Sequence, residues 1–198
     1  DSRAGAGDVK YIDQNADGRL TVGRGTTEDY GDMDFLGTTN PRLLYGANLG
    51  FQWKGLDFSM FFQGVGKRNY RPGTESIAPL FVTWKQAHGI HRDYWTPENP
   101  NATYPRPFIG ATHNYLSSDK WVLNARYTRL KNIQVGYTLP IGKNANNLRV
   151  YAQVKNAFTF TKYSGYDPEI SSGVLDTGVD RGNYPQPRVW MGGLQFNF

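Results

Sequence analysis

The chain has 198 residues, about the length of one domain, and 22 Lys and Arg against 17 Asp and Glu give it a formal charge of +5. Its 23 glycines and 11 prolines exclude a helical bundle, and the absence of cysteine excludes disulfides and thiolate metal sites. No apolar run approaches the ~18 residues of a spanning helix. The composition predicts a turn-rich all-β protein, either soluble or a membrane barrel, because a barrel strand is apolar only at every second residue.

Five segments alternate between apolar and polar residues, as strands with two different faces do. They cover residues 44–53, 56–65, 127–139, 148–158 and 188–198. Each reaches about the ~9–11 residues that a barrel strand needs to cross a bilayer, whereas strands of soluble proteins cluster near ~5–6. Lys54-Gly55, between the first two segments, suits the two-residue turn of a hairpin. The pattern favours a membrane barrel.

The connections between these segments alternate in length. Two are short, at residues 54–55 and 140–147, and the others are long and irregular. Outer-membrane barrels combine short periplasmic turns with long extracellular loops. We therefore expect hairpins at 44–65 and 127–158, a terminal strand at 188–198, and extracellular segments at 1–43, 66–126 and 159–187.

Five strands do not make a complete barrel, because a bacterial barrel built from one chain has an even number of strands. We therefore expect the chain to supply the C-terminal antiparallel strands of a larger transmembrane β-barrel with long extracellular loops. Two alternatives stay open. One is a soluble or surface β-rich carbohydrate-binding module, and the other is a small complete outer-membrane barrel.

The last strand has an aromatic, alternating end that stops on the final carboxylate. Its apolar residues are Trp190, Leu194, Phe196 and Phe198. This ending resembles the signal that barrel-assembly machinery reads on bacterial outer-membrane proteins. The alternative is an ordinary edge strand, but an exposed aromatic edge is an aggregation hazard in a soluble protein. We expect these residues to form an assembly signal.

Residues 13–18 match the first half of a calcium-binding loop, D-x-[DN]-x-[DN]-G. Alternate oxygens converge on the ion because Gly18 permits the sharp turn. The expected ligands are the side chains of Asp13, Asn15 and Asp17 and the carbonyl of Arg19. The twelfth position holds Arg24, where a closing carboxylate belongs. A more distant carboxylate could reach back, from Glu28, Asp29 or Asp32, and the alternative is a hydrated turn without calcium.

Motifs for catalysis are missing from the sequence. It contains no nucleophile elbow, phosphate loop or HExxH motif. His88 and His91 precede Asp93 without an evident third metal ligand. Asp167 and Glu169 would fit a glycosidase-like pair, but nothing adjoining supports that interpretation. We expect no catalytic site.

Cations and aromatic residues of the long connections suggest other roles. The cations are scattered, which argues against nucleic acid as a partner, and Lys67, Arg68 and Arg71 form the densest group. Aromatic faces stack on sugar rings and pack at protein interfaces. Candidate contacts to substrate or partner are Trp84, Trp95, Tyr104, Tyr163 and Tyr166. Alternatively, these side chains hold the large loops together.

Several blocks of the sequence resemble one family. They are Gly7–Gly18, Phe61–Gly66, Tyr94–Ala102, Leu130–Pro140, Leu148–Ile170 and Tyr184–Arg188, followed by the terminal strand. In this order they resemble the C-terminal region of SusC/RagA-type TonB-dependent outer-membrane transporters. The chain departs from the family pattern at Arg24, where relatives tend to have an acidic residue.

The resemblance implies a plugged barrel of about 22 strands in the outer membrane of a Gram-negative bacterium. It implies import of glycans or peptides, with a SusD-like surface lipoprotein over the barrel and energy relayed by TonB. The TonB-contacting plug would be absent from this chain. Its expected partners are therefore the rest of the barrel, the plug, the lipoprotein and outer-membrane lipid.

Deleting Phe198 from the full-length protein should impair membrane assembly, because the aromatic C-terminus is the expected recognition signal. The measurement is the amount of protein recovered in the outer-membrane fraction. Normal insertion of the truncated protein would contradict the assembly signal.

Overall fold

A computed structural model describes residues 4–80, 86–141, 147–169 and 178–197 of the chain. The chain divides into two compact units, and each is described by itself. One unit comprises Asp1–Gly37 and Arg71–Val122, and the other comprises Thr38–Tyr70 and Leu123–Phe198. In the described part, no helix is long and apolar enough to cross a membrane.

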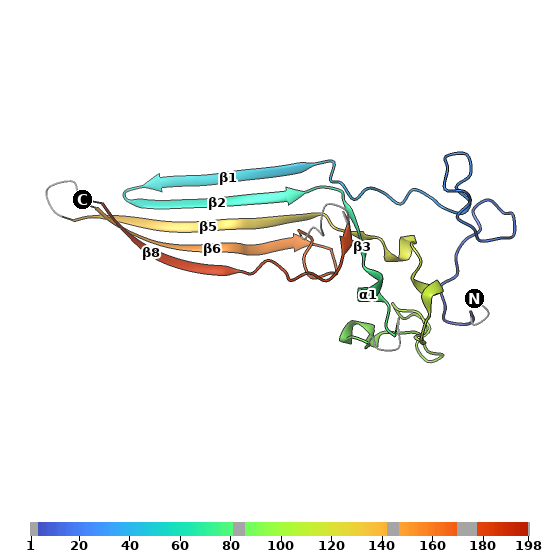
Figure 1. Cartoon of the computed structure of the whole chain (residues 1–198). Coiled ribbons are helices and arrows are strands. Elements are labelled where there is room, and N and C mark those ends of the chain that lie inside the picture. Colours follow the sequence, from blue (N-terminus) through green and yellow to red (C-terminus); the bar gives the residue numbers. More distant parts are fainter. Residues whose placement is uncertain (1–3, 81–85, 142–146, 170–177, 198) are drawn as a thin grey trace. The chain divides into compact units, whose positions relative to one another are not determined.

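The second unit is built on a five-stranded antiparallel sheet (Figure 1). Its strand order is β1-β2-β5-β6-β8. The strands are β1 (Leu44–Trp53), β2 (Leu56–Val65), β5 (Tyr127–Pro140), β6 (Asn147–Thr161) and β8 (Val189–Asn197). The all-β, antiparallel fold class is confirmed, and β1 and β2 have the predicted bounds. β6 continues to Thr161, beyond the predicted end at residue 158.

A smaller sheet lies within the connections that the sequence leaves irregular. Its strand order is β4-β3-β7, and its strands are β3 (Asn69–Pro72), β4 (Leu123–Asn124) and β7 (Val179–Asp180). Beside it, Tyr70, Ala125 and Tyr163 form a buried cluster. Strands of two to four residues are too short for an alternating pattern to reveal them.

The first unit has short helical turns around an aromatic core. They are α1 (Thr74–Ile77), η1 (Gly89–Arg92), η2 (Thr112–Tyr115) and η3 (Asp119–Trp121). The core side chains are Ile77, Ala78, Tyr104, Ala111, Tyr115 and Trp121. The indole Nε1 of Trp121 donates a hydrogen bond to the Asn114 carbonyl at 2.9 Å, so the largest core side chain has its polar atom satisfied.

The pairing register of the large sheet gathers apolar side chains on one face. One row across the strands is Leu49, Met60, Ile133, Val154 and Trp190, and another is Trp53, Leu56, Tyr137, Val150 and Leu194. Several of these side chains are largely exposed, with Trp190 at 74% and Leu194 at 72%. A continuous exposed apolar face of this kind marks a surface that contacts lipid or protein.

A β-bulge at Lys131 changes which face the start of β5 presents. Phe61 on β2 pairs with Asn132 and Phe62 pairs with Leu130, which leaves Lys131 as the extra residue opposite β2. On the other side, Lys131 lies opposite two residues of β6, at positions 156 and 157. Unbroken alternation would place Arg129 on the same face as the apolar Ile133. The bulge instead puts Leu130 on the apolar face and turns Arg129 to the polar one, opposite Thr159.

The polar face carries an ion pair that spans three strands. Arg149 on β6 holds Asp57 on β2 through two hydrogen bonds, Nε to Oδ1 at 2.8 Å and Nη2 to Oδ2 at 2.5 Å. Gly136 on β5 is the ladder partner of Asp57. A Cβ atom at Gly136 would come within 2.5 Å of Asp57 Oδ1 and 2.6 Å of Arg149 Nη2. The pair therefore needs a residue without a side chain at this position.

Gly136→Ala should destabilise the sheet, because the added methyl group must displace the Asp57–Arg149 pair. Hydrogen bonds to charged groups are worth ~1.5–3 kcal/mol, and we expect a loss near the lower end because both side chains are partly exposed. The measurement is the apparent melting temperature of the full-length protein in detergent. Gly192→Ala on β8 is the matched control, since its Cβ meets only the Tyr151 carbonyl, at 3.8 Å. Equal melting temperatures for the two variants would refute the steric argument.

Candidate functional site

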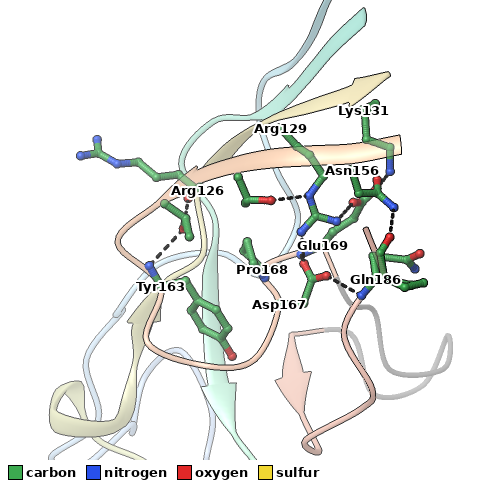
Figure 2. A network of polar contacts seen from close by, with 12 residues as sticks. Arg126, Arg129, Lys131, Asn156, Tyr163, Asp167, Pro168, Glu169 and Gln186 are labelled. Atoms are coloured by element: carbon green, nitrogen blue, oxygen red, sulfur yellow. Dashed lines mark hydrogen bonds and ion pairs between the residues drawn. The ribbon is translucent and has the colours of Figure 1, made fainter. Parts of the chain in front are cut away.

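A buried polar network lies where β5 and β6 meet the following connection, and Arg129 is its centre (Figure 2). The guanidinium donates from Nε to Thr159 Oγ1 at 2.7 Å. It also donates from Nη1 to Glu169 Oε2 at 2.5 Å and from Nη2 to Asp167 Oδ1 at 2.6 Å. A buried guanidinium is stable only when it is paired and hydrogen-bonded in this way.

The two carboxylates extend the network into the chain around them. Asp167 accepts the backbone N–H of Glu169 and that of Gln186, each at 2.9 Å. Glu169 also accepts from Lys131 Nζ at 2.7 Å, so the residue of the β-bulge belongs to the network as well. Burial alone would raise the pKa of Asp167, but the bonds from Arg129 and the two amides outweigh it and hold this pKa below its usual range. Asp167 stays ionised, and it ties residue 186 to the strand.

The contacts of Asp167 and Glu169 bear on the glycosidase-like pair considered from the sequence. Both carboxylates are engaged by cations, and Asp167 is almost fully buried. A glycosidase needs one carboxyl that holds a proton and a second that faces the sugar. The geometry instead makes the pair an anchor for the connection after β6.

Tyr163 packs inside the same connection. Its hydroxyl donates to Asp180, and its ring meets Tyr70 edge-on at a centroid distance of 5.9 Å. Arg68 lies over the other ring of this pair, 4.3 Å from the Tyr70 centroid, and donates to the Pro168 carbonyl. Burial, followed by the hydrogen bond to Asp180, raises the pKa of Tyr163. The structure therefore gives this predicted contact residue an internal packing position.

Tyr166 has the opposite environment. Its side chain is 75% exposed and lines a shallow pocket of about 360 Å³ beside the network. Other lining residues include Asn156, Pro185, Gln186 and Arg188. Of the two predicted contact residues in this connection, Tyr166 is exposed and Tyr163 is buried. The role of Tyr166 stays a prediction.

The two aromatic candidates of the first unit that the structure describes, Trp95 and Tyr104, contribute to its packing. The ring of Trp95 lies against Gly7, where a Cβ atom would be 2.3 Å from Trp95 Cε3. Tyr104 is buried in the core, with its ring 5.8 Å from that of Trp121 and 5.0 Å from that of His91. Trp84 lies outside the described residues. The rings of Trp95 and Tyr104 therefore both make packing contacts within the first unit.

Asp8 is a polar centre of the first unit that the sequence does not reveal. Its carboxylate accepts from Gly5 N at 2.8 Å, Arg106 Nη2 at 2.8 Å and Asn114 Nδ2 at 2.9 Å. Burial raises the pKa of Asp8, but these hydrogen bonds outweigh it and lower the value to about 2. Arg106 and Asn114 lie about a hundred positions away in sequence, so no local motif predicts their contact with Asp8.

The predicted calcium loop is closed by its own backbone. Asp13 accepts the N–H groups of Asp17 and Gly18, at 3.2 and 2.8 Å. Asp32 reaches back as one of the expected carboxylates, but it accepts from Gln14 and Thr21. Among the described residues, no group of three or more His, Cys, Asp or Glu is arranged to hold a metal. Calcium binding at Asp13, Asn15, Asp17 and the Arg19 carbonyl stays a prediction.

The assembly-signal residues lie on β8. Trp190, Leu194 and Phe196 are exposed on the apolar face of the sheet, whereas Phe198 lies outside the described residues. This placement agrees with the predicted alternation of the last strand, and the assembly role itself stays a prediction.

If calcium binds, the Asp13→Asn variant should bind it more weakly, because one charged ligand becomes neutral. The measurement is isothermal titration of chelator-treated, full-length protein with calcium. Asp34→Asn is the control, since Asp34 is exposed and lies outside the loop. Absence of a calcium-binding heat in the unsubstituted protein would remove the metal site.

Asp167→Asn should loosen the connection after β6, because the buried Arg129 loses a charged partner. We expect amide hydrogen exchange at Glu169 and Gln186 to accelerate about 10- to 100-fold, the equivalent of ~1.5–3 kcal/mol. Asp34→Asn is again the matched control, with exchange at both amides unchanged. If Asp167→Asn leaves these amides as protected as before, the network does not anchor the connection.

The comparisons with known proteins cover nearly the whole chain, although no family profile matches it. TonB-dependent receptor P3 of Formosa agariphila is 30% identical over 84% of this chain and 17% of its own length. TonB-dependent receptor P26 of the same organism is 28% identical over 97% of this chain and 20% of its own. TonB-dependent receptor SusC of Bacteroides thetaiotaomicron is 26% identical over 95% of this chain and 17% of its own.

Solved structures give the same result for the fold. The RagAB peptide importer in its closed-closed state superposes with a TM-score of 0.63 and 26% identity, over 81% of this chain and 18% of the matched chain. The open-open state of the importer gives a TM-score of 0.62. The chain thus spans about a fifth of the length of the relatives that it matches. In sequence and in fold, it is similar to the C-terminal region of SusC/RagA-type TonB-dependent outer-membrane transporters.

Proposed function

We propose that this chain forms part of the barrel wall of an outer-membrane importer that is energised through TonB. The observation that carries the proposal is the two-faced sheet, whose exposed apolar face would contact lipid while its polar face lines the lumen. Strands of 9 to 15 residues suit a bilayer crossing. The relatives named as TonB-dependent receptors support the same function.

The imported material would be an oligosaccharide or a peptide, captured with the help of a SusD-like surface lipoprotein. The likeness to SusC and to the RagAB peptide importer supports this pairing. In this chain, Tyr166 beside the shallow pocket is the side chain best placed to touch such a ligand, because its exposed ring offers a stacking surface for a sugar or a peptide.

The test follows uptake in living cells. A strain that lacks the gene is supplied with mixtures of oligosaccharides and of oligopeptides, and depletion of each from the medium is measured by mass spectrometry. We expect uptake of one class to be lost, and to be lost equally when TonB is inactivated. Unchanged uptake of both classes would contradict an import role, and a full-length protein that is monodisperse in buffer without detergent would favour the carbohydrate-binding module.

A pair of substitutions tests the contact residue. Tyr166→Ala should reduce uptake severalfold while the amount of protein in the outer membrane stays constant. Tyr184→Ala is the matched control, because Tyr184 is also exposed, at 89%, but does not line the pocket. Equal uptake by both variants would show that Tyr166 makes no contact with the imported material.

A further inference from the structure

The apolar face of the large sheet ends in a row of different chemistry. Tyr45, Gly64, Thr128 and Phe160 pair across β1, β2, β5 and β6, so they share one face. The neighbouring row is apolar throughout and consists of Ala47, Phe62, Leu130 and Phe158. Hydroxyl groups thus appear where the apolar surface stops, which is the position of a membrane–water boundary in a barrel.

Gly64 sets the position of the Tyr45 ring in this row. A Cβ atom at Gly64 would be 2.0 Å from Tyr45 Cζ, so the ring lies directly over the glycine. The Tyr45 hydroxyl thereby reaches across β2 to β5, where its oxygen lies 2.5 Å from Thr128 Oγ1. Two hydroxyl groups are therefore held side by side at the boundary, with the ring itself on the apolar surface.

Two cations lie beside this row. Arg126 and Lys162 are exposed, and with Tyr45, Thr128 and Phe160 they line a shallow pocket of about 410 Å³, here called the boundary pocket. In Figure 2 the side chain of Arg126 points away from the Arg129 network. Within the described parts of the chain, no ion pair involves Arg126 or Lys162. Their charges are available to an anion.

We propose that the boundary pocket binds the phosphate group of a membrane lipid, whose acyl chains lie along the adjacent apolar rows. The inference rests on the proposed placement of the sheet in the outer membrane. Arginine and lysine form charge-assisted hydrogen bonds to phosphate, and aromatic residues mark the membrane interface. A free phosphate ion would use the cations but not the apolar rows, so the geometry matches a lipid better than an inorganic anion.

The experiment measures lipid retention by the full-length protein in detergent, using native mass spectrometry. The probes are diphosphorylated lipid A, the same lipid without its phosphates, and inorganic phosphate in molar excess as a competitor. The Arg126→Ala/Lys162→Ala variant should bind diphosphorylated lipid A about 25-fold more weakly, since each basic side chain near an anionic surface contributes a factor of about five. The phosphate-free lipid should bind both proteins equally.

Arg92→Ala/Lys10→Ala is the matched control, because it removes the same two charges from exposed positions of the other unit. It should retain the lipid like the unsubstituted protein. Equal retention by Arg126→Ala/Lys162→Ala would overturn the proposal, as would displacement of the lipid by inorganic phosphate. Recovery of the unsubstituted protein from the outer-membrane fraction is checked first, so a failure of the proposed placement is distinguished from a failure of the lipid site.

Discussion

The polar network at the connection after β6 depends on the pairing of one buried guanidinium, that of Arg129. Arg129 lies within the polar network, where an unpaired charge would be strongly destabilising. Its carboxylate partners come from the connection after β6, so the strand and the connection stabilise each other. The dependence is mutual, because the buried Asp167 would lose its cationic partner if Arg129 turned away.

The β-bulge at Lys131 makes that pairing compatible with a sheet of two opposite faces. In a β-strand, a shift of one residue exchanges every side chain between the faces. The bulge confines the shift to the first residues of β5, so Ile133 and the alternate residues after it stay on the apolar face while Arg129 turns to the polar side. Since Lys131 also binds Glu169, the inserted residue serves the network that it makes possible.

The long strands could be predicted from the sequence because alternation over ten or more residues is a strong, local signal. The face of the sheet on which Arg129 lies could not be predicted, since nothing in the residues around Lys131 distinguishes a bulge from continued alternation. The same holds for the centre at Asp8, which depends on Arg106 and Asn114 from a remote part of the chain. A carboxylate in an irregular segment has too many potential partners for sequence reasoning to choose one.

Two neighbouring residues after β6 differ sharply in exposure. Asp167 is buried in an ion pair, whereas the residue before it, Tyr166, is exposed. A contact residue next to a fixed anchor loses little conformational freedom on binding, because most of that freedom was lost on folding. Under the proposed function, the polar network would serve recognition indirectly, by fixing the chain next to Tyr166.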